Sequence, residues 1–157
     1  KGSFASLVPV VREQITGLVR TRDPRWEGDP NNQWHSLAGG IGANHLGDMF
    51  YCDNQGPWNG SSSLKHLKIG SFQGNPTGNV HYQLTDAIGP RPEDPKSGSR
   101  IVEEAERIPE YVPPACILPH GSMGNSPAGI ACDQTDGKFG PFKNQLFIAE
   151  QTASQVQ

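Results

Sequence analysis

A run of oxygen-bearing side chains before a Gly-Pro turn is the part of the chain whose residue types could bind a metal. Asp53, Asn54 and Gln55 come directly before Gly56 and Pro57. A hard cation such as calcium takes roughly six to eight oxygen ligands, many of them backbone carbonyls. Gly56 lets the chain turn so that successive carbonyls converge, and Pro57 stiffens that turn. The loop therefore predicts a calcium site, with the simpler alternative that Gly56-Pro57 is only a tight turn after a strand.

Histidines are the other residues that could act in catalysis. His120 lies between Pro119 and Gly121 at the predicted exit of a strand, and it is the candidate catalytic residue. His66 belongs to the alternating segment 64–70, which predicts a strand with one solvated face. The sequence shows neither the His-x-x-His spacing of a zinc site nor the Gly-x-Ser-x-Gly element of a hydrolase.

The cysteines do not indicate a metal site. Cys52, Cys116 and Cys132 are an odd set without zinc-site spacing, so a fully paired disulfide framework is excluded and one disulfide stays open. Free cysteines are often buried as small apolar side chains, which is the alternative for all three.

Composition indicates a fold rich in turns. Hydrophobic residues make up 34% of the 157 residues, and the chain holds 19 Gly and 14 Pro. These proportions favour turns and ordered loops over a helical bundle. The net charge of −3 and the scattered basic residues exclude the basic surface of a nucleic-acid-binding protein. The apolar runs are too short to span a membrane, and no signal peptide is recognisable.

Two stretches of the chain resemble each other. Each starts with a short Gly-Ile strand, predicted at 39–44 and at 128–133. Each continues with an apolar strand that ends in an acid and a glutamine, predicted at 47–54 and at 145–150. Small residues in the first strand suit a place where neighbouring backbones crowd, as in the inner strands of a propeller blade. The alternative is coincidence between two Gly-rich hairpins.

The region between these hairpins is expected to be less regular. Further strands are predicted at 64–69 and at 115–118, and a short helix at 100–108 from the spacing of its aliphatic residues. Residues 88–114 are expected to form a loop and helix excursion between blades, and residues 10–35 are unassigned. The predicted class is all-β.

The order of the motifs resembles the glucose and sorbosone dehydrogenase-like family, the quinoprotein sugar dehydrogenase type of six-bladed β-propeller. The resemblance covers residues 36–157 and is closest to large bacterial secreted or membrane-associated relatives. It is carried by five segments: 53–60, 64–67, 70–76, 119–130 and 140–151. It implies that residues 1–157 form a partial β-propeller domain of two or three blades with long loops.

The resemblance also implies chemistry. Such enzymes oxidise a sugar or an aldehyde by hydride transfer to pyrroloquinoline quinone, aided by calcium. By their match to the family motif, the carbonyls of Gly56 and Pro57 are the candidate calcium ligands, with Gln55 and Asp53 close by. Relatives act in the periplasm or outside the cell, and the implied partners are the remaining propeller blades or a cytochrome c-type domain.

The chain also departs from the family. Quinone-binding relatives place an arginine before the Gly-Ile strand, and residues 34–40 contain none. The catalytic base would lie outside this chain, which is expected to be catalytically silent alone. An open arc of blades also leaves apolar faces and strand edges exposed, so we expect association or aggregation. The alternative function is a non-catalytic propeller that binds a glycan or a protein and retains only the scaffold.

Overall fold

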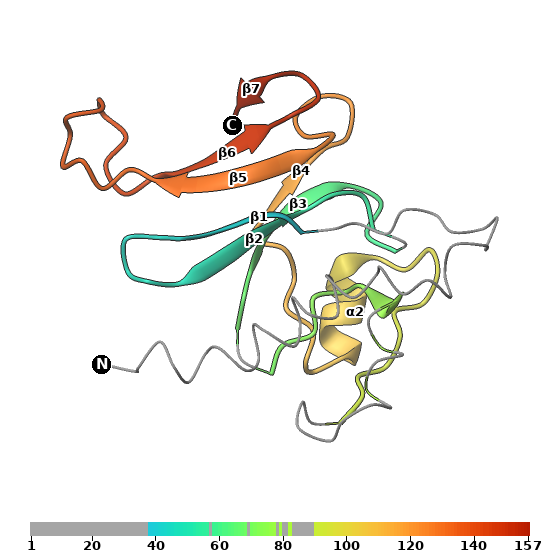
Figure 1. The fold of residues 1–157 in the computed structure, drawn as a ribbon. Coiled ribbons are helices and arrows are strands. Elements are labelled where there is room, and N and C mark those ends of the chain that lie inside the picture. The colour runs from blue at the N-terminus through green and yellow to red at the C-terminus, as the bar shows by residue number, and fades with distance from the viewer. Residues whose placement is uncertain (1–37, 57, 69, 78, 80–81, 83–89) are drawn as a thin grey trace, which may run out of the picture.

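The computed structural model describes residues 38–157 except 57, 69, 78, 80–81 and 83–89. Over these residues the chain is mostly sheet, with one short helix, which confirms the all-β class (Figure 1). The strands form two antiparallel sheets, of order β1-β2-β3-β4 and β5-β6-β7, so each sheet is a meander in chain order. The strands are β1 (Ala38–Ala43), β2 (Met49–Asp53), β3 (Ser62–His66), β4 (Cys116–Leu118), β5 (Pro127–Cys132), β6 (Leu146–Glu150) and β7 (Gln155–Val156).

All six predicted strands are present, with ends displaced by at most three residues, while β7 was not predicted. The strand predicted at 64–69 is displaced most. The amide of Leu67 makes the last pairing, to the Met49 carbonyl at 2.8 Å, and the chain then turns. The predicted single solvated face of β3 is wrong, because its residues 62–65 are buried on both faces. Residues 10–35 lie outside the described part of the chain.

The two hairpins of the sequence repeat have the same register. Ile41 pairs with Tyr51 in the first hairpin, and Ile130 pairs with Ile148 in the second. Each hairpin has a register shift between this pair and the end of the apolar strand. In each, the shift places the acid that ends the apolar strand opposite the residue three positions before the isoleucine of the Gly-Ile strand. These shifted pairs are Ala38 with Asp53 and Pro127 with Glu150. The sequence similarity is therefore a repeat of structure down to the position of the irregularity.

The two sheets pack against each other through their first strands. A Cβ atom added to Gly40 would lie 1.6 Å from the Ala128 carbonyl oxygen, and one added to Gly42 would lie 2.9 Å from the Ile130 Cβ. Only glycine allows two backbones to approach so closely. Beside this contact the sheets share an apolar core of Cys52, Leu64, Leu118 and Ile148, flanked by Phe50, Ile130 and Leu146.

The loop and helix excursion expected between blades lies instead within the first sheet, between β3 and β4. We use the name excursion for the described residues within 67–115, which form a second, smaller core. It contains α2 (Ile101–Arg107), which confirms the helix predicted at 100–108. Phe72, Ile108 and Tyr111 are buried together there, and Phe72 and Tyr111 form an isolated parallel bridge. Trp58, from the loop that follows β2, packs edge-on against Tyr111 with ring centroids 5.5 Å apart. The excursion is therefore attached to that loop by aromatic packing.

The three cysteines are all free thiols. Cys52 is fully buried in the core between the sheets, and burial, followed by the charge of Asp53, raises its pKa to about 12. Cys132 is half-buried, whereas Cys116 is exposed on β4. The expectation of buried apolar cysteines therefore holds for Cys52 and is wrong for Cys116.

Candidate functional site

The loops that carry Gln55, Gly56 and His120 lie at one end of the two sheets, whereas His66 lies at the other end, opposite Phe50. Gly40 lies against Ala128 and Gly42 against Ile130, so β1 and β5 run in the same direction. The antiparallel pairings then make β2, β4 and β6 all end on the same side. The loops after these strands, 54–61, 119–126 and 151–154, meet at that side, on the right in Figure 1. We call it the loop end.

The predicted metal-binding residues and the candidate catalytic histidine share this end. Asp53 closes β2, and Gln55 and Gly56 follow it in the 54–61 loop, with Gln55 exposed and Gly56 half-buried. Pro57 lies outside the described residues. His120 is exposed in the 119–126 loop, which is closed by a hydrogen bond from the Met123 amide to the Pro119 carbonyl at 2.9 Å. The fold thus brings the predicted residues to neighbouring loops of one surface.

The Asp53 carboxylate is not turned to this surface. It is 3% exposed, and its Oδ2 accepts a hydrogen bond from the Lys65 ammonium at 2.6 Å. Lys65 is 1% exposed and donates a second bond to the Gln73 carbonyl at 3.0 Å. The Lys65 Nζ also lies 5.7 Å from the centroid of the Tyr51 ring. An ammonium group therefore already occupies one oxygen of the acid that the sequence suggested as a metal ligand.

This buried pair joins the first sheet to the excursion. Lys65 pairs with Tyr51 across the sheet, and Asp53 pairs with Ser63, so all four point to the face opposite the apolar core. The Gln73 side chain donates to the His66 carbonyl and to the Ser71 hydroxyl, at 3.2 and 2.6 Å. Burial, followed by the negative charge of Asp53, raises the pKa of Tyr51 well above its usual value. This pairing was not predicted, because Lys65 lies in a segment whose alternating pattern indicated a strand with one solvated face.

The 54–61 loop offers neutral oxygens in place of the carboxylate. Among the described residues, the amide oxygens Asn54 Oδ1 and Asn59 Oδ1 are buried without a hydrogen-bond partner, and so is the hydroxyl of Ser63 at the base of the loop. Buried polar atoms without partners are rare and call for a ligand, an ion or a water molecule. Amide oxygens are ligands that calcium accepts. Asn54 and Asn59 therefore have oxygens available for a ligand, whereas one oxygen of Asp53 is taken by Lys65.

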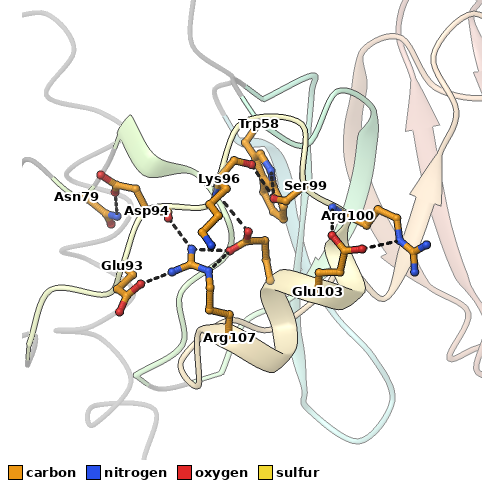
Figure 2. Close-up of polar contacts among 10 residues, drawn as sticks. Trp58, Asn79, Glu93, Asp94, Lys96, Ser99, Arg100, Glu103 and Arg107 are labelled. Carbon is orange, nitrogen blue, oxygen red and sulfur yellow. Dashed lines mark hydrogen bonds and ion pairs between the residues drawn. The ribbon is translucent and has the colours of Figure 1, made fainter.

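The excursion fixes the 54–61 loop from its outer side. Trp58 Nε1 donates to the Ser99 hydroxyl at 3.3 Å, and Ser99 donates to the Lys96 carbonyl at 2.6 Å (Figure 2). Behind them, Glu104 is 1% exposed and accepts two bonds from Arg107. Burial alone raises the pKa of Glu104, but hydrogen bonds, that from Arg107 first, outweigh it and lower the pKa.

The same network extends along the excursion. Arg107 also contacts Glu93 and donates to the Asp94 carbonyl at 2.7 Å (Figure 2). Asp94 accepts from Asn79 and from Arg91, both at 2.6 Å, and these bonds, that from Asn79 first, lower its pKa. The described residues from Arg91 to Arg107 are thereby held together behind the 54–61 loop.

The acid that corresponds to Asp53 in the second hairpin has a different partner set. Glu150 is 3% exposed, and its carboxylate accepts bonds from the backbone amides of Ser126, Thr152 and Ala153, at 2.7, 3.1 and 2.5 Å. These bonds, that from Ala153 first, lower its pKa despite burial. Glu150 therefore ties the 119–126 loop, which carries His120, to the turn before β7.

The described residues hold no group of three or more His, Cys, Asp or Glu side chains that could bind a metal. Nor does any helix within them have the length and apolar character needed to cross a membrane. Comparison of the chain with family models, with curated proteins and with solved structures gives no match.

Proposed function

We propose that the two sheets are successive blades of a β-propeller of the glucose and sorbosone dehydrogenase-like type. The observation that carries the proposal is the stacking of two meanders through equivalent first strands, with the same register shift in each hairpin. Propeller blades are four-stranded meanders arranged around a channel, with their first strands innermost. A ring needs roughly four to eight blades, so the remaining ones would come from outside the described residues.

We further propose that the loop end faces the substrate of a sugar- or aldehyde-oxidising quinoprotein. Its calcium would be held by the 54–61 loop, through Asn54, Asn59 and backbone carbonyls, and would polarise the bound cofactor. Gln55 and the carbonyl of Gly56 are within the same loop, whereas Asp53 stays with Lys65. The expectation of a base outside this chain is kept, with His120 as the alternative. Periplasmic or extracellular location and a cytochrome c-type partner belong to the same proposal.

The described loops offer no cationic side chain that could pair with the quinone. Segments 54–61, 119–126 and 151–154 contain neither lysine nor arginine. The acid groups of such a cofactor require positively charged side chains. Those groups would have to be supplied by other blades, so no catalytic step is assigned to this chain.

Calcium binding is the direct test. We expect calorimetric titration of the whole chain with calcium chloride to show saturable binding. Asn54→Ala and Asn59→Ala should each weaken it about tenfold or more, since a contact with a charged group contributes roughly 1.5–3 kcal/mol. Gln145→Ala, an exposed amide at the opposite end of the sheets, is the matched control and should bind as the unmodified chain does. Absence of binding, or equal binding by all variants, would reject the site.

A non-catalytic binding propeller is the second candidate. It is favoured by the internal Asp53–Lys65 pair, which removes a carboxylate from the loop end, and by the lack of basic residues there. Reduction of an artificial dye with sugars or aldehydes, after addition of calcium and pyrroloquinoline quinone, tests whether His120 serves as the base, and glycan binding tests the binding module. Turnover by this chain supports the dehydrogenase and directs attention to His120. A silent chain that binds a glycan supports the binding module.

A further inference from the structure

One face of the second sheet is apolar, and no other described sheet or helix packs on it. Gly129, Ala131 and Ala149 are exposed on it, and Val156 of β7 is 65% exposed. Phe147, which pairs with Ala131, lies on the same face and packs against two exposed phenylalanines of the 133–145 loop, Phe139 and Phe142. None of these side chains is polar. We call this the slot face.

The repeat shows what covers such a face. Gly129 and Ala131 occupy the positions of Gly40 and Gly42 in the first hairpin, as the registers show. In the same way Phe147, Ala149 and Val156 correspond to Phe50, Cys52 and Leu64. That face of the first sheet is covered by the second sheet, whose Ile130, Leu146 and Ile148 lie in the shared core. The slot face is therefore the repeat of a surface that this chain itself buries under a sheet.

The first sheet carries the complementary surface. Ile41, which is 42% exposed, shares a face with Ala43, Met49 and Tyr51, and we call this the key face. These four correspond to Ile130, Cys132, Leu146 and Ile148, the residues of the second sheet that face the first sheet. None of the four key-face side chains and none of their four counterparts in the second sheet is charged. The excursion covers this side of the sheet at Lys65 and Asp53, whereas Ile41 is left accessible.

We infer that the slot face binds the key face of a second copy of this chain, in a head-to-tail contact. The closest approach in the molecule needs a glycine at Gly40, and its counterpart on the slot face is again glycine, Gly129. Ala131 replaces Gly42, so the backbones are spaced slightly wider at that end. Because the two surfaces differ, association continues beyond a dimer until a ring closes or a filament grows.

This inference rests on the stacked repeat and not on calcium or redox chemistry. Failure of self-association therefore leaves the calcium titration informative, and the reverse holds too. A further sheet from a different polypeptide is the competing occupant of the slot face. A chain that stays monomeric on its own would indicate that a different polypeptide covers the slot face.

Sedimentation over a concentration series tests the inference on the whole chain. The average mass is expected to rise above the 17.0 kDa monomer with concentration. Ala131→Lys places a charge on the slot face, and Ile41→Lys places one on the key face. Each should weaken association about tenfold or more, because a charge would be buried at the contact. Val102→Lys, on a 56% exposed side chain of α2, is the control and should associate normally.

Mixing the two variants gives the decisive result. The Ala131→Lys chain retains an intact key face, and the Ile41→Lys chain retains an intact slot face. These two faces can bind each other, so the mixture should form a one-to-one dimer that grows no further. Circular dichroism of each variant verifies that the sheets are retained. A wild-type chain that stays monomeric at all concentrations overturns the inference without reference to any variant. So does association that both substitutions leave unchanged, or a mixture of the two variants that forms no dimer.

Discussion

Removing the ammonium group of Lys65 should destabilise the protein far more than a typical surface substitution. Lys65→Met keeps the length of the side chain but leaves Asp53 as a buried carboxylate without its cation. Breaking one side of a buried ion pair costs about 3–5 kcal/mol. The bond to the Gln73 carbonyl is lost as well, at about 1 kcal/mol. Small domains have a free energy of unfolding of roughly 5–15 kcal/mol, so much of it would be lost.

A double variant distinguishes the effect of losing the ion pair from the effect of changing the side chain at residue 65. Asp53→Leu combined with Lys65→Met replaces both charges by apolar groups, which is often close to neutral for buried pairs. We expect the double variant to recover all but about 1–2 kcal/mol, the part due to the unpaired Gln73 carbonyl. Lys68→Met, three residues on and exposed, is the control and should change stability by about 0.5 kcal/mol or less.

Urea unfolding followed by circular dichroism and tryptophan fluorescence measures these differences. Coincident transitions by the two probes would justify a two-state treatment. The reasoning is refuted if Lys65→Met costs less than about 1 kcal/mol, since that is the range of an exposed pair. It is equally refuted if the double variant is as unstable as the single one, because the cost would then come from packing rather than from charge.

Two further predictions concern the repeat. Gly40→Ala should abolish or strongly weaken the packing of the sheets, because its Cβ would overlap the Ala128 carbonyl. Gly129→Ala, at the equivalent position, should be tolerated, because its Cβ would meet only the Ala149 Cβ at 3.9 Å. Equal urea midpoints for the two variants would contradict the close approach of the strands. Glu150 has a pKa lowered below the ordinary value of 4.5, so its contribution is fully present above that pH and is lost as the pH falls through the lower folded pKa. Glu150→Gln should flatten the acid side of the stability–pH curve, and an unchanged curve would show that the three amide bonds do not form.

The sequence predicted the hairpins well because their signals are local. Glycines, a repeated Gly-Ile strand and a closing acid all lie within a few residues of one another. β7 was missed because Gln155 and Val156 give no periodicity, and they are strand only through pairing with Ala149 and Glu150. A strand of two residues is defined by its neighbour rather than by its own composition.

The site was predicted less completely, for a physical reason. Asp53 was predicted as an oxygen donor beside a Gly-Pro turn, and Gln55 and Gly56 do lie at the loop end. Its partner Lys65 is distant along the chain and comes close only when β2 pairs with β3. Whether β3 is solvated depends on the excursion, whose packing through Phe72 and Tyr111 has no local signature. Side-chain roles that depend on two long-range contacts are beyond a single-sequence argument.

The excursion also sets the order in which the first sheet can be completed. β4 pairs with β3 over only three residue pairs, and residues 67–115 separate the two strands. Closing a flexible loop of that length costs about 3–4 kcal/mol of chain entropy, more than such a short pairing readily supplies. The ion pairs of Arg107 with Glu93 and Glu104 join residues 93–107. The Phe72 amide donates to the Glu110 carbonyl and the Val112 amide donates to the Phe72 carbonyl, so these bonds hold the two ends of the loop near each other. Pairing of β4 with β3 therefore depends on the folded excursion, and loss of the contacts within it is expected to release this outermost strand first.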